Sequence, residues 1–337
     1  VLAAQEFASS LTGDSSLSSR PMTRITEPLG LMGANTSTTK QGTLPIQIEP
    51  VDSLKSIKYA LPVASAQVKS CLLFAGLYSQ GMTEIEENVT TRDHTERMFK
   101  QFGINLDISQ SKNTKIIKLN GVESISPANI NICGDFSSAS FFILAALITP
   151  NSELLLKNVG VNPTRIGFLH ALRHMGANIE LLSKEDSFEP TADILVKTSN
   201  LKGITLNTNL VANMIDEMPA FFIAASLAEG ITKVKGAKEL RTKESDRLQV
   251  MSEVLDSFGV KFQLEEDGIT INGLGKTGTF KAAEINSHGD HRIAMASSIG
   301  SLRSDGVTTI LDCLNVNTSF PNFIDVCQEI GMSIEKL

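Results

Sequence analysis

The sequence is poor in three things, and each scarcity narrows what this chain of 337 residues can be. It has no long hydrophobic run: the longest, residues 139–148, is half of the roughly 20 residues that a membrane-spanning helix needs, so we expect a buried helix there. It has no excess of basic residues, since 30 Lys and Arg face 37 Asp and Glu. This acidic balance argues against general nucleic-acid binding.

Closely spaced cysteines are the third absence. Four cysteines stand far apart in apolar contexts, without a C-x-x-C pair: Cys71, Cys133, Cys313 and Cys327. This pattern predicts neither a zinc site nor a disulfide framework and is typical of a reducing cytoplasm. His170 and His174 lie four residues apart, but no acidic third ligand or H-E-x-x-H pattern accompanies them, so we expect no bound metal.

The start of the chain has neither an initiator Met nor the basic segment that opens a secretory signal. We therefore expect the sequence to be a cut from a longer protein. Its composition, 42% hydrophobic and 20% charged residues, is that of a soluble globular protein. Its length predicts about two domains.

A short pattern recurs five times: an apolar residue, a glycine, then alternating apolar residues. The glycines are 70 to 83 residues apart, at Gly33, Gly103, Gly176, Gly259 and Gly331. Upstream of four of them the apolar residues fall at helical spacing, and downstream the period changes to two. The pattern predicts helices that end at a left-handed glycine. It also predicts strands that follow, at residues 104–108, 177–181, 260–264 and 332–334.

A second type of helix is expected half a period away, in stretches that are largely apolar and rich in small residues: 64–77, 137–147, 218–230 and 291–302. The repeated unit then reads strand, helix, strand, helix, strand, strand. Helices that are apolar all round imply units packed about shared helices with sheets outside, so the fold class is α/β (α+β). We place the domain boundary at residue 132: the first domain, 1–132, holds about two units and the second, 133–337, holds three.

Basic and polar residues gather in the loops that open the helices. The stretches are SSRPMTR (18–24), TTRDHTER (90–97), NPTRIG (162–167), LRTKESDR (240–247) and GDHR (289–292). In an acidic protein, five such loops at equivalent points suggest one anionic pocket, to which helix N-termini add hydrogen-bond donors. The alternative is that each Arg or Lys only solvates the start of a helix.

Individual residues in these loops have both a structural and a functional interpretation. Asp216 precedes an apolar helix, where an unpaired carboxylate is unfavourable, so it serves either chemistry or helix capping. Lys243, Glu244 and Arg247 have the spacing of one helix face. They form either a functional set or a surface salt bridge.

The stretch that opens the helix at 64–77 has the same ambiguity. Ser65 and Gln67 follow Pro62 and can donate to a phosphate or a hydroxyl group, and we expect Lys69 to help them. Capping by Ser65 explains part of the same pattern. His291 stands in a polar loop beside Arg292.

Nine motifs, ordered along the whole chain, resemble the class II bacterial form of the 5-enolpyruvylshikimate-3-phosphate synthase family. They are GDSSLSSRPM, LPVASAQVKSCLLFAGL, TTRDHTERM, GDFSSASFFILAAL, NPTRIG, MIDEMP, LRTKESDRL, GDHRIAMA and TSFPNF. The family has two domains of three βαβαββ units each, and its chain begins in the second domain, crosses to the first and returns. The resemblance implies that this sequence lacks one strand of the second domain and about one unit of the first. It also implies an active site in the cleft between the domains.

The resemblance implies a cytoplasmic, monomeric transferase without metal or organic cofactor. It would move the enolpyruvyl group of phosphoenolpyruvate to the 5-hydroxyl of shikimate 3-phosphate and release phosphate. Asp216 would act near the 5-hydroxyl, and Glu244 or Lys243 would transfer protons at the enolpyruvyl carbon. The residues implied to bind shikimate 3-phosphate are Ser65, Ala66, Gln67, Arg92, Asp216 and Lys243. Those implied to bind phosphoenolpyruvate are Arg20, Gln67, Arg247, His291 and Arg292.

The sequence departs from the family pattern in two ways. The family's Lys-Ser loop and Gly-Asn-x-Gly-Thr loop are missing, which implies that this stretch alone is inactive, and Asn317 stands where many relatives have Lys.

Two rival interpretations of the function remain. One rival is the sister enzyme that uses UDP-N-acetylglucosamine, which commonly has a reactive Cys on a mobile loop, whereas Cys71 falls in an expected helix. The other rival is a non-catalytic anion-binding relative.

Overall fold

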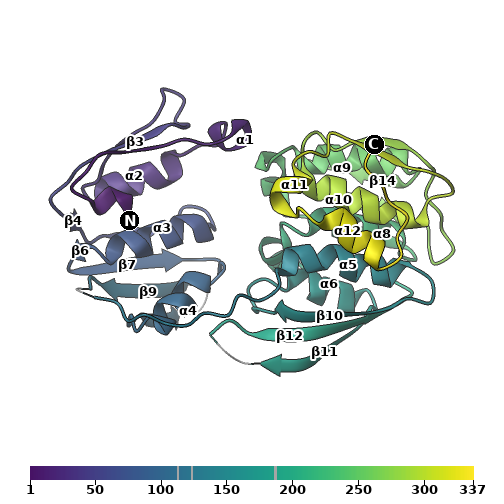
Figure 1. Cartoon of the computed structure of the whole chain (residues 1–337), viewed down its shortest axis with the longest axis horizontal. Helices are drawn as coiled ribbons and strands as arrows, with labels where there is room; N and C mark the ends of the chain where they lie inside the picture. Colours follow the sequence, from purple (N-terminus) through teal and green to yellow (C-terminus); the bar gives the residue numbers. More distant parts are fainter. Residues whose placement is uncertain (112–113, 123, 186–187) are drawn as a thin grey trace. The chain divides into compact units, whose positions relative to one another are not determined.

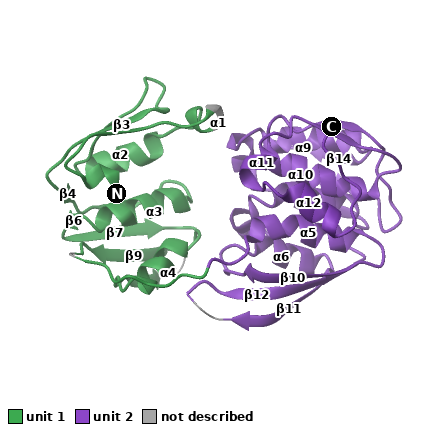
Figure 2. Ribbon diagram, in the orientation of Figure 1, with its two compact units in different colours: residues 1–131 green, residues 132–337 purple. Residues whose placement is uncertain are grey.

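The computed structural model describes residues 1–111, 114–122, 124–185 and 188–337 (Figure 1). The chain forms two compact units, 1–131 and 132–337 (Figure 2). The division falls one residue before the boundary that the sequence suggests. No helix in the described residues is both long enough and apolar enough to cross a bilayer.

Unit 1 contains one complete copy of the predicted unit. Its elements are η1 (Leu2–Ala4), β1 (Ser9–Leu11), α1 (Ser15–Ser18), α2 (Thr23–Leu31), β2 (Asn35–Ser37), β3 (Ile46–Glu49), β4 (Leu54–Lys55), β5 (Lys58–Ala60), α3 (Ala66–Gly76), β6 (Ser79–Gln80), β7 (Met82–Glu87), α4 (His94–Gln101), β8 (Asp107–Ser111) and β9 (Thr114–Asn120). From β5 to β9 the principal elements read strand, helix, strand, helix, strand, strand. The short strand β6 joins β4 in a separate pair.

Unit 2 alternates helices and strands in the same way. Its elements are α5 (Phe136–Ile148), β10 (Glu153–Gly160), α6 (Gly167–His174), β11 (Asn178–Glu185), β12 (Thr191–Lys197), α7 (Thr208–Val211), η2 (Ala212–Met214), α8 (Met218–Ser226), β13 (Ile231–Val234), η3 (Lys238–Thr242), α9 (Arg247–Ser257), β14 (Lys261–Leu264), β15 (Ile269–Asn272), β16 (Glu284–Asn286), α10 (His291–Gly300), η4 (Ser301–Arg303), β17 (Thr309–Leu311), α11 (Val316–Ser319) and α12 (Phe323–Glu329). The predicted helices at 64–77, 137–147, 218–230 and 291–302 are confirmed as α3, α5, α8 and α10.

One strand order recurs in four sheets. It appears as β1-β3-β2 and β7-β9-β8 in unit 1, and as β10-β12-β11 and β13-β15-β14 in unit 2. In each case the last strand of the copy lies in the middle and pairs antiparallel with both neighbours. The repeat that the glycine spacing predicts is therefore present in the strand topology.

Each recurring glycine ends a helix, as predicted for four of them, and the helix before Gly33 is an addition. Gly176, for example, has a φ of 90°. Its N–H donates to the carbonyl of Arg173 at 3.0 Å, and the N–H of Ala177 donates to the carbonyl of Leu172 at 3.0 Å. This pair of bonds is the Schellman motif, which satisfies the last carbonyls of a helix. The equivalent bonds follow α2, α4, α9 and α12, at Gly33, Gly103, Gly259 and Gly331.

Three apolar helices form the centre of unit 2. Helices α5, α8 and α10 pack on one another, and all residues of α8 are buried. Helix α5 covers the apolar run 139–148, so the buried helix expected there is confirmed. Figure 1 shows the β10–β12–β11 sheet along one side of α5 and α6. Loops that open α8, α9 and α10 are thereby held by a rigid apolar core.

Two of the predicted strands differ in the structure. After Gly103, strand β8 begins only at Asp107. After Gly331, no strand forms in the described residues 332–337. Here the carbonyl of Ile334 accepts from Gln328 Nε2 at 2.7 Å, so a side chain takes a group that a strand would pair. The period of two indicated a strand, but a strand forms only where another strand pairs with it.

Candidate active site

Six predicted site residues lie at the openings of the helices of unit 2. Asp216 precedes α8, and Arg247 is the first residue of α9. His291 and Arg292 are the first two residues of α10. The remaining two, Lys243 and Glu244, lie between η3 and α9. Their placement at three helix N-termini concentrates hydrogen-bond donors.

Arg247 is the hub of this group. Its side chain is 1% exposed, and its Nε donates to Asp290 Oδ2 at 2.8 Å. Its Nη2 donates to Glu244 Oε2 and to Asp290 Oδ1. Burial lowers the pKa of Arg247, but the carboxylates of Asp290 and Glu244 outweigh burial, so the net pKa is raised. The site therefore contains a permanent buried cation.

Asp216 lies between two guanidinium groups. Its Oδ1 is 3.7 Å from Arg247 Nη1, and its Oδ2 is 3.8 Å from Arg165 Nη1. Arg292 Nη1 donates to the backbone carbonyl of Asp216 at 3.3 Å. The capping interpretation of Asp216 is wrong, because the N-cap residue of α8 is Glu217, whose side chain makes no capping hydrogen bond within the described part of the chain.

The sequence patterns did not indicate Asp290 as a site residue. They also did not indicate the buried hydrogen-bonded group of Arg165, Ser137 and Glu217 next to Asp216. Arg165 Nη2 donates to Ser137 Oγ at 2.6 Å and to Glu217 Oε1 at 3.2 Å, and Ser137 Oγ donates to the same carboxylate oxygen. Glu217 is 1% exposed. A signal was present, since Glu217 is a charged residue directly before a wholly apolar helix and a buried charge requires a partner.

Two donors of the cluster have no hydrogen-bond partner within the described part of the chain. They are the buried Nη1 atoms of Arg165 and Arg247, the same atoms that lie closest to Asp216. A buried polar group without a hydrogen bond is unfavourable by about 1–3 kcal/mol. These two N–H groups are therefore suited to an anionic ligand, which would supply the missing acceptors.

Lys243 differs from its prediction. Helix α9 begins at Arg247, so residues 243–246 precede the helix and the predicted shared helix face does not exist. Glu244 and Arg247 of the predicted set are in contact. The Nζ of Lys243 lies 2.6 Å from Glu239 Oε1. The surface salt-bridge interpretation is wrong for Glu244 and Arg247, because Arg247 is buried.

His291 has an altered acid–base property. Burial, followed by the positive charge of Arg292, lowers its pKa below the ordinary value. The nearby carboxylate of Asp290 acts in the opposite direction but does not restore it. The lowered pKa favours the neutral imidazole, which has one N–H donor and one acceptor nitrogen.

The remaining predicted residues lie in unit 1. The Ser65 hydroxyl caps α3 by accepting from the N–H of Val68 at 3.3 Å, so the capping interpretation is confirmed. Ala66 and Gln67 are the first residues of α3. Arg92 lies in the loop between β7 and α4, and Arg20 lies just after α1.

Lys69 does not join them in the way we expected. Its side chain is 0% exposed and contacts the carboxylates of Glu87 and Glu96. A lysine that is completely buried and paired with two carboxylates is not available for a substrate phosphate. The expectation that Lys69 helps Ser65 and Gln67 directly is therefore wrong.

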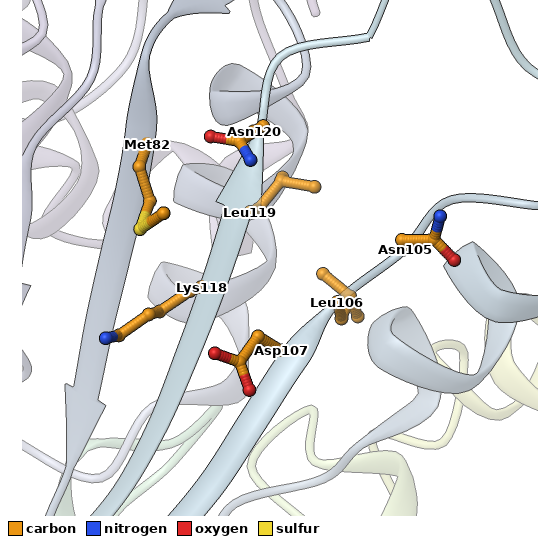
Figure 3. A pocket seen from close by; sticks show the side chains of 7 residues that line it. All are labelled: Met82, Asn105, Leu106, Asp107, Lys118, Leu119 and Asn120. Atoms are coloured by element: carbon orange, nitrogen blue, oxygen red, sulfur yellow. The ribbon is translucent and has the colours of Figure 1, made fainter.

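Unit 1 contains a cavity that is not lined by any predicted site residue. It measures about 230 Å³ and lies beside the strands β7, β8 and β9 (Figure 3). The side chains around it are Met82, Asn105, Leu106, Asp107, Lys118, Leu119 and Asn120, and none of them is a predicted site residue. Lys118 is 3.5 Å from Glu84, so its charge is already paired. In the described residues, no group of three His, Cys, Asp or Glu side chains is arranged as metal ligands.

The fold by itself defines a class first. The structure matches that of the enolpyruvyl transferase NikO from Streptomyces tendae with a TM-score of 0.75. The match covers 97% of this chain and 74% of the other, at 14% identity, so it concerns the fold alone. The chain therefore has the enolpyruvyl transferase fold of repeated βαβαββ units.

The family follows from more similar proteins. Residues 1–327 match the family EPSP synthase (3-phosphoshikimate 1-carboxyvinyltransferase). The chain is 47% identical over 336 residues to the 3-phosphoshikimate 1-carboxyvinyltransferase of Methylococcus capsulatus, covering 99% of this chain and 75% of the relative. One EPSP synthase structure from Acinetobacter baumannii matches with a TM-score of 0.87 at 47% identity, covering 99% of this chain and 76% of that one. This chain belongs to the EPSP synthase family.

Proposed function

We propose that this protein transfers the enolpyruvyl group of phosphoenolpyruvate to the 5-hydroxyl of shikimate 3-phosphate and releases phosphate, a step of aromatic amino acid biosynthesis. The observation that carries the proposal is the buried Arg247, which is surrounded by Glu244, Asp216 and Asp290 at the start of α9. Family membership supports it, since the relatives are named for 3-phosphoshikimate carboxyvinyl transfer.

The chemistry requires acids, bases and cations together. The 5-hydroxyl loses its proton as its oxygen bonds to the central carbon of phosphoenolpyruvate, and the methylene carbon gains a proton to become a methyl group. The tetrahedral intermediate then loses a methyl proton and its phosphate, which restores the double bond. Asp216 serves as base for the hydroxyl, and Glu244 or Lys243 moves the proton at carbon. The geometry supports Glu244 of these two, because it contacts Arg247.

Cations meet the charge of the two anionic substrates. Arg247, Arg292 and Arg20, with His291 and Gln67, bind the phosphate and carboxylate groups of phosphoenolpyruvate. The Nη1 of Arg247, which has no hydrogen-bond partner among the described residues, supports its part in this set. Shikimate 3-phosphate is bound by Ser65, Ala66, Gln67, Arg92, Asp216 and Lys243. Hydrogen bonds to charged groups contribute about 1.5–3 kcal/mol each.

The sister enzyme that uses UDP-N-acetylglucosamine is not favoured. Its reactive Cys would need a lowered pKa. Burial instead raises the pKa of Cys71, Cys133 and Cys313, and it raises that of Cys327 to about 12. Thiols of this kind are poor nucleophiles. The chain acts, in this proposal, as a cytoplasmic monomer on small-molecule substrates, without a metal, an organic cofactor or nucleic acid.

The test measures phosphate release by the full-length gene product with phosphoenolpyruvate and either acceptor. We expect phosphate and an enolpyruvyl ether in equal amounts with shikimate 3-phosphate, and none with UDP-N-acetylglucosamine. Phosphate release with the UDP-sugar alone would refute the proposal. Asp216→Asn should remove turnover while the far-ultraviolet circular dichroism spectrum is unchanged. Full turnover in that variant would show that Asp216 is not the base, and a wild-type protein that releases no phosphate with either acceptor would favour the non-catalytic anion-binding relative.

A further inference from the structure

A buried network of four charges in unit 1 is not used by the proposed chemistry. It consists of Lys69 on α3, Glu87 at the end of β7, Glu96 on α4 and Lys115 on β9, which we call the charge quartet. The side chains are 0% to 10% exposed. Lys69 Nζ is 2.8 Å from Glu96 and 3.3 Å from Glu87, and Lys115 Nζ is 3.2 Å and 3.4 Å from the same carboxylates.

Stability does not explain the charge quartet. Its two positive and two negative charges cancel, but each must leave water, and apolar replacements of such groups are often neutral or stabilising. In addition, Glu96 Oε2 is buried and has no hydrogen-bond partner in the part of the chain that the structure describes. What the network does provide is a fixed mutual placement of α3, β7, α4 and β9, since each ammonium group contacts carboxylates from two different elements.

Two segments with predicted substrate-binding residues meet at this network. The loop that carries Arg92 is tied to Glu87, because Thr91 Oγ1 donates to Glu87 Oε2 at 2.8 Å and the Thr91 N–H donates to the same oxygen at 3.4 Å. Lys69 lies one turn after Ser65, whose hydroxyl caps α3. Glu87 therefore joins the residue before Arg92 to the helix that opens with Ser65, Ala66 and Gln67.

A second contact ties the same elements together. Ser70 Oγ of α3 lies 2.7 Å from Thr95 Oγ1 of α4, in a hydrogen bond between two hydroxyl groups. Ser70 is the residue after Lys69, and Thr95 is the residue before Glu96. The loop of Arg92 is thus fixed to α3 on both of its sides, through Thr91 and through Thr95.

We propose that the charge quartet, acting through Glu87 and Thr91, positions Arg92 relative to the opening turn of α3 for the binding of shikimate 3-phosphate. The inference rests on the function proposed above, which gives Arg92 and that turn to this substrate. In this inference Thr91 and the charge quartet act through Arg92, so they are positioning residues. A guanidinium must be held closely in place to bind a phosphate through two hydrogen bonds.

The test removes one hydrogen bond and leaves the charges in place. Thr91→Val has nearly the same shape as the natural side chain but lacks the hydroxyl, so Glu87 loses its shortest bond to the loop. In the full-length gene product, we expect the Kd and KM for shikimate 3-phosphate to rise about tenfold, which corresponds to roughly 1.4 kcal/mol. We expect kcat and the KM for phosphoenolpyruvate to stay within about twofold. Thr91→Ser keeps the hydroxyl and should restore the affinity.

Controls distinguish positioning from general damage. Glu84→Gln lies on the same strand as Glu87, and its carboxylate pairs with the exposed Lys58 at 2.8 Å, so it should leave every parameter unchanged. Glu87→Gln should weaken shikimate 3-phosphate binding more than Thr91→Val does. If Glu87→Gln does not fold, the comparison of Thr91→Val with Thr91→Ser tests the inference. A Thr91→Val protein with a lowered Tm but an unchanged Kd for shikimate 3-phosphate overturns the inference.

The outcome also separates this inference from the function on which it rests. Arg92→Gln should raise the KM for shikimate 3-phosphate if the proposed function is correct. If Arg92→Gln has that effect and Thr91→Val has none, the proposed function stands and the positioning role is overturned. If the wild-type protein releases no phosphate with shikimate 3-phosphate, both are overturned.

Discussion

Replacing Asp290 with Asn should strongly destabilise unit 2. Asp290 is 0% exposed and accepts from Arg247 Nε at 2.8 Å, Ser245 Oγ at 3.1 Å and the Arg292 N–H at 3.0 Å. Removing one partner of a buried ion pair destabilises a protein by about 3–5 kcal/mol. Because Glu244 still contacts Arg247, we expect the lower end, about 3 kcal/mol. For a unit of this size, Tm should fall by about 6–12 °C.

The assay is calorimetry with far-ultraviolet circular dichroism, because the chain has no Trp and its two Tyr, Tyr59 and Tyr78, lie in unit 1. The matched control is Asp246→Asn. Asp246 caps α9 and pairs with Arg241 at 2.8 Å in a more exposed position. Asn caps a helix as well as Asp does, so this change should cost less than about 1 kcal/mol.

Two results would refute the reasoning about Asp290. The first is a stability of Asp290→Asn equal to that of Asp246→Asn, which would mean that the buried charge of Arg247 needs no partner. The second comes from the double variant Arg247→Met with Asp290→Asn. It should be destabilised by less than the sum of the two single variants, because it removes the unpaired charge. Simple additivity would contradict the account.

Two further predictions concern His291 and the repeated glycines. In an NMR titration of the free protein, the midpoint of His291 should lie below the ordinary value of about 6.5 and should rise when phosphoenolpyruvate binds; a midpoint above that value in the free protein contradicts the assignment. Because folding lowers the pKa of His291, the neutral imidazole contributes its full stabilisation above about pH 6.5. This stabilisation is lost as the pH falls through the pKa of His291 in the folded protein. Gly33→Ala should destabilise by about 1–2 kcal/mol, since its φ is 90°. Gly30→Ala, inside α2 and with open space around it, should stabilise the protein by about 0.5–1 kcal/mol. If the two variants change the free energy of urea unfolding equally, Gly33 is not required as the cap of α2.

The repeat could be predicted from the sequence because it is a local signal. A helical period, a glycine and a period of two depend on neighbouring residues only, and Gly176 with its Schellman bonds behaves accordingly. The prediction of a strand at 332–334 was wrong because strand pairing is not a local property. A strand needs a partner elsewhere in the chain, and the carbonyl of Ile334 accepts from Gln328 instead.

The candidate site was only half predictable for a related reason. Motifs indicated Asp216, Glu244, Arg247 and Arg292, since each lies at the opening of a helix. The partners that hold them are distant in sequence, as Ser137 is from Glu217 and Arg247 is from Asp290. No local pattern pairs such residues, because only the packing of the repeated units brings them together.

If the buried cluster around Arg247 performs enolpyruvyl transfer, Glu244 moves the proton at carbon, and Glu244→Gln in the full-length gene product tests this role. The variant keeps the shape of the side chain and removes its proton-transfer ability. In an assay of phosphate release from phosphoenolpyruvate and shikimate 3-phosphate, kcat should fall at least about 100-fold with an unchanged circular dichroism spectrum. Turnover of Glu244→Gln at the wild-type rate would rule out proton transfer by Glu244.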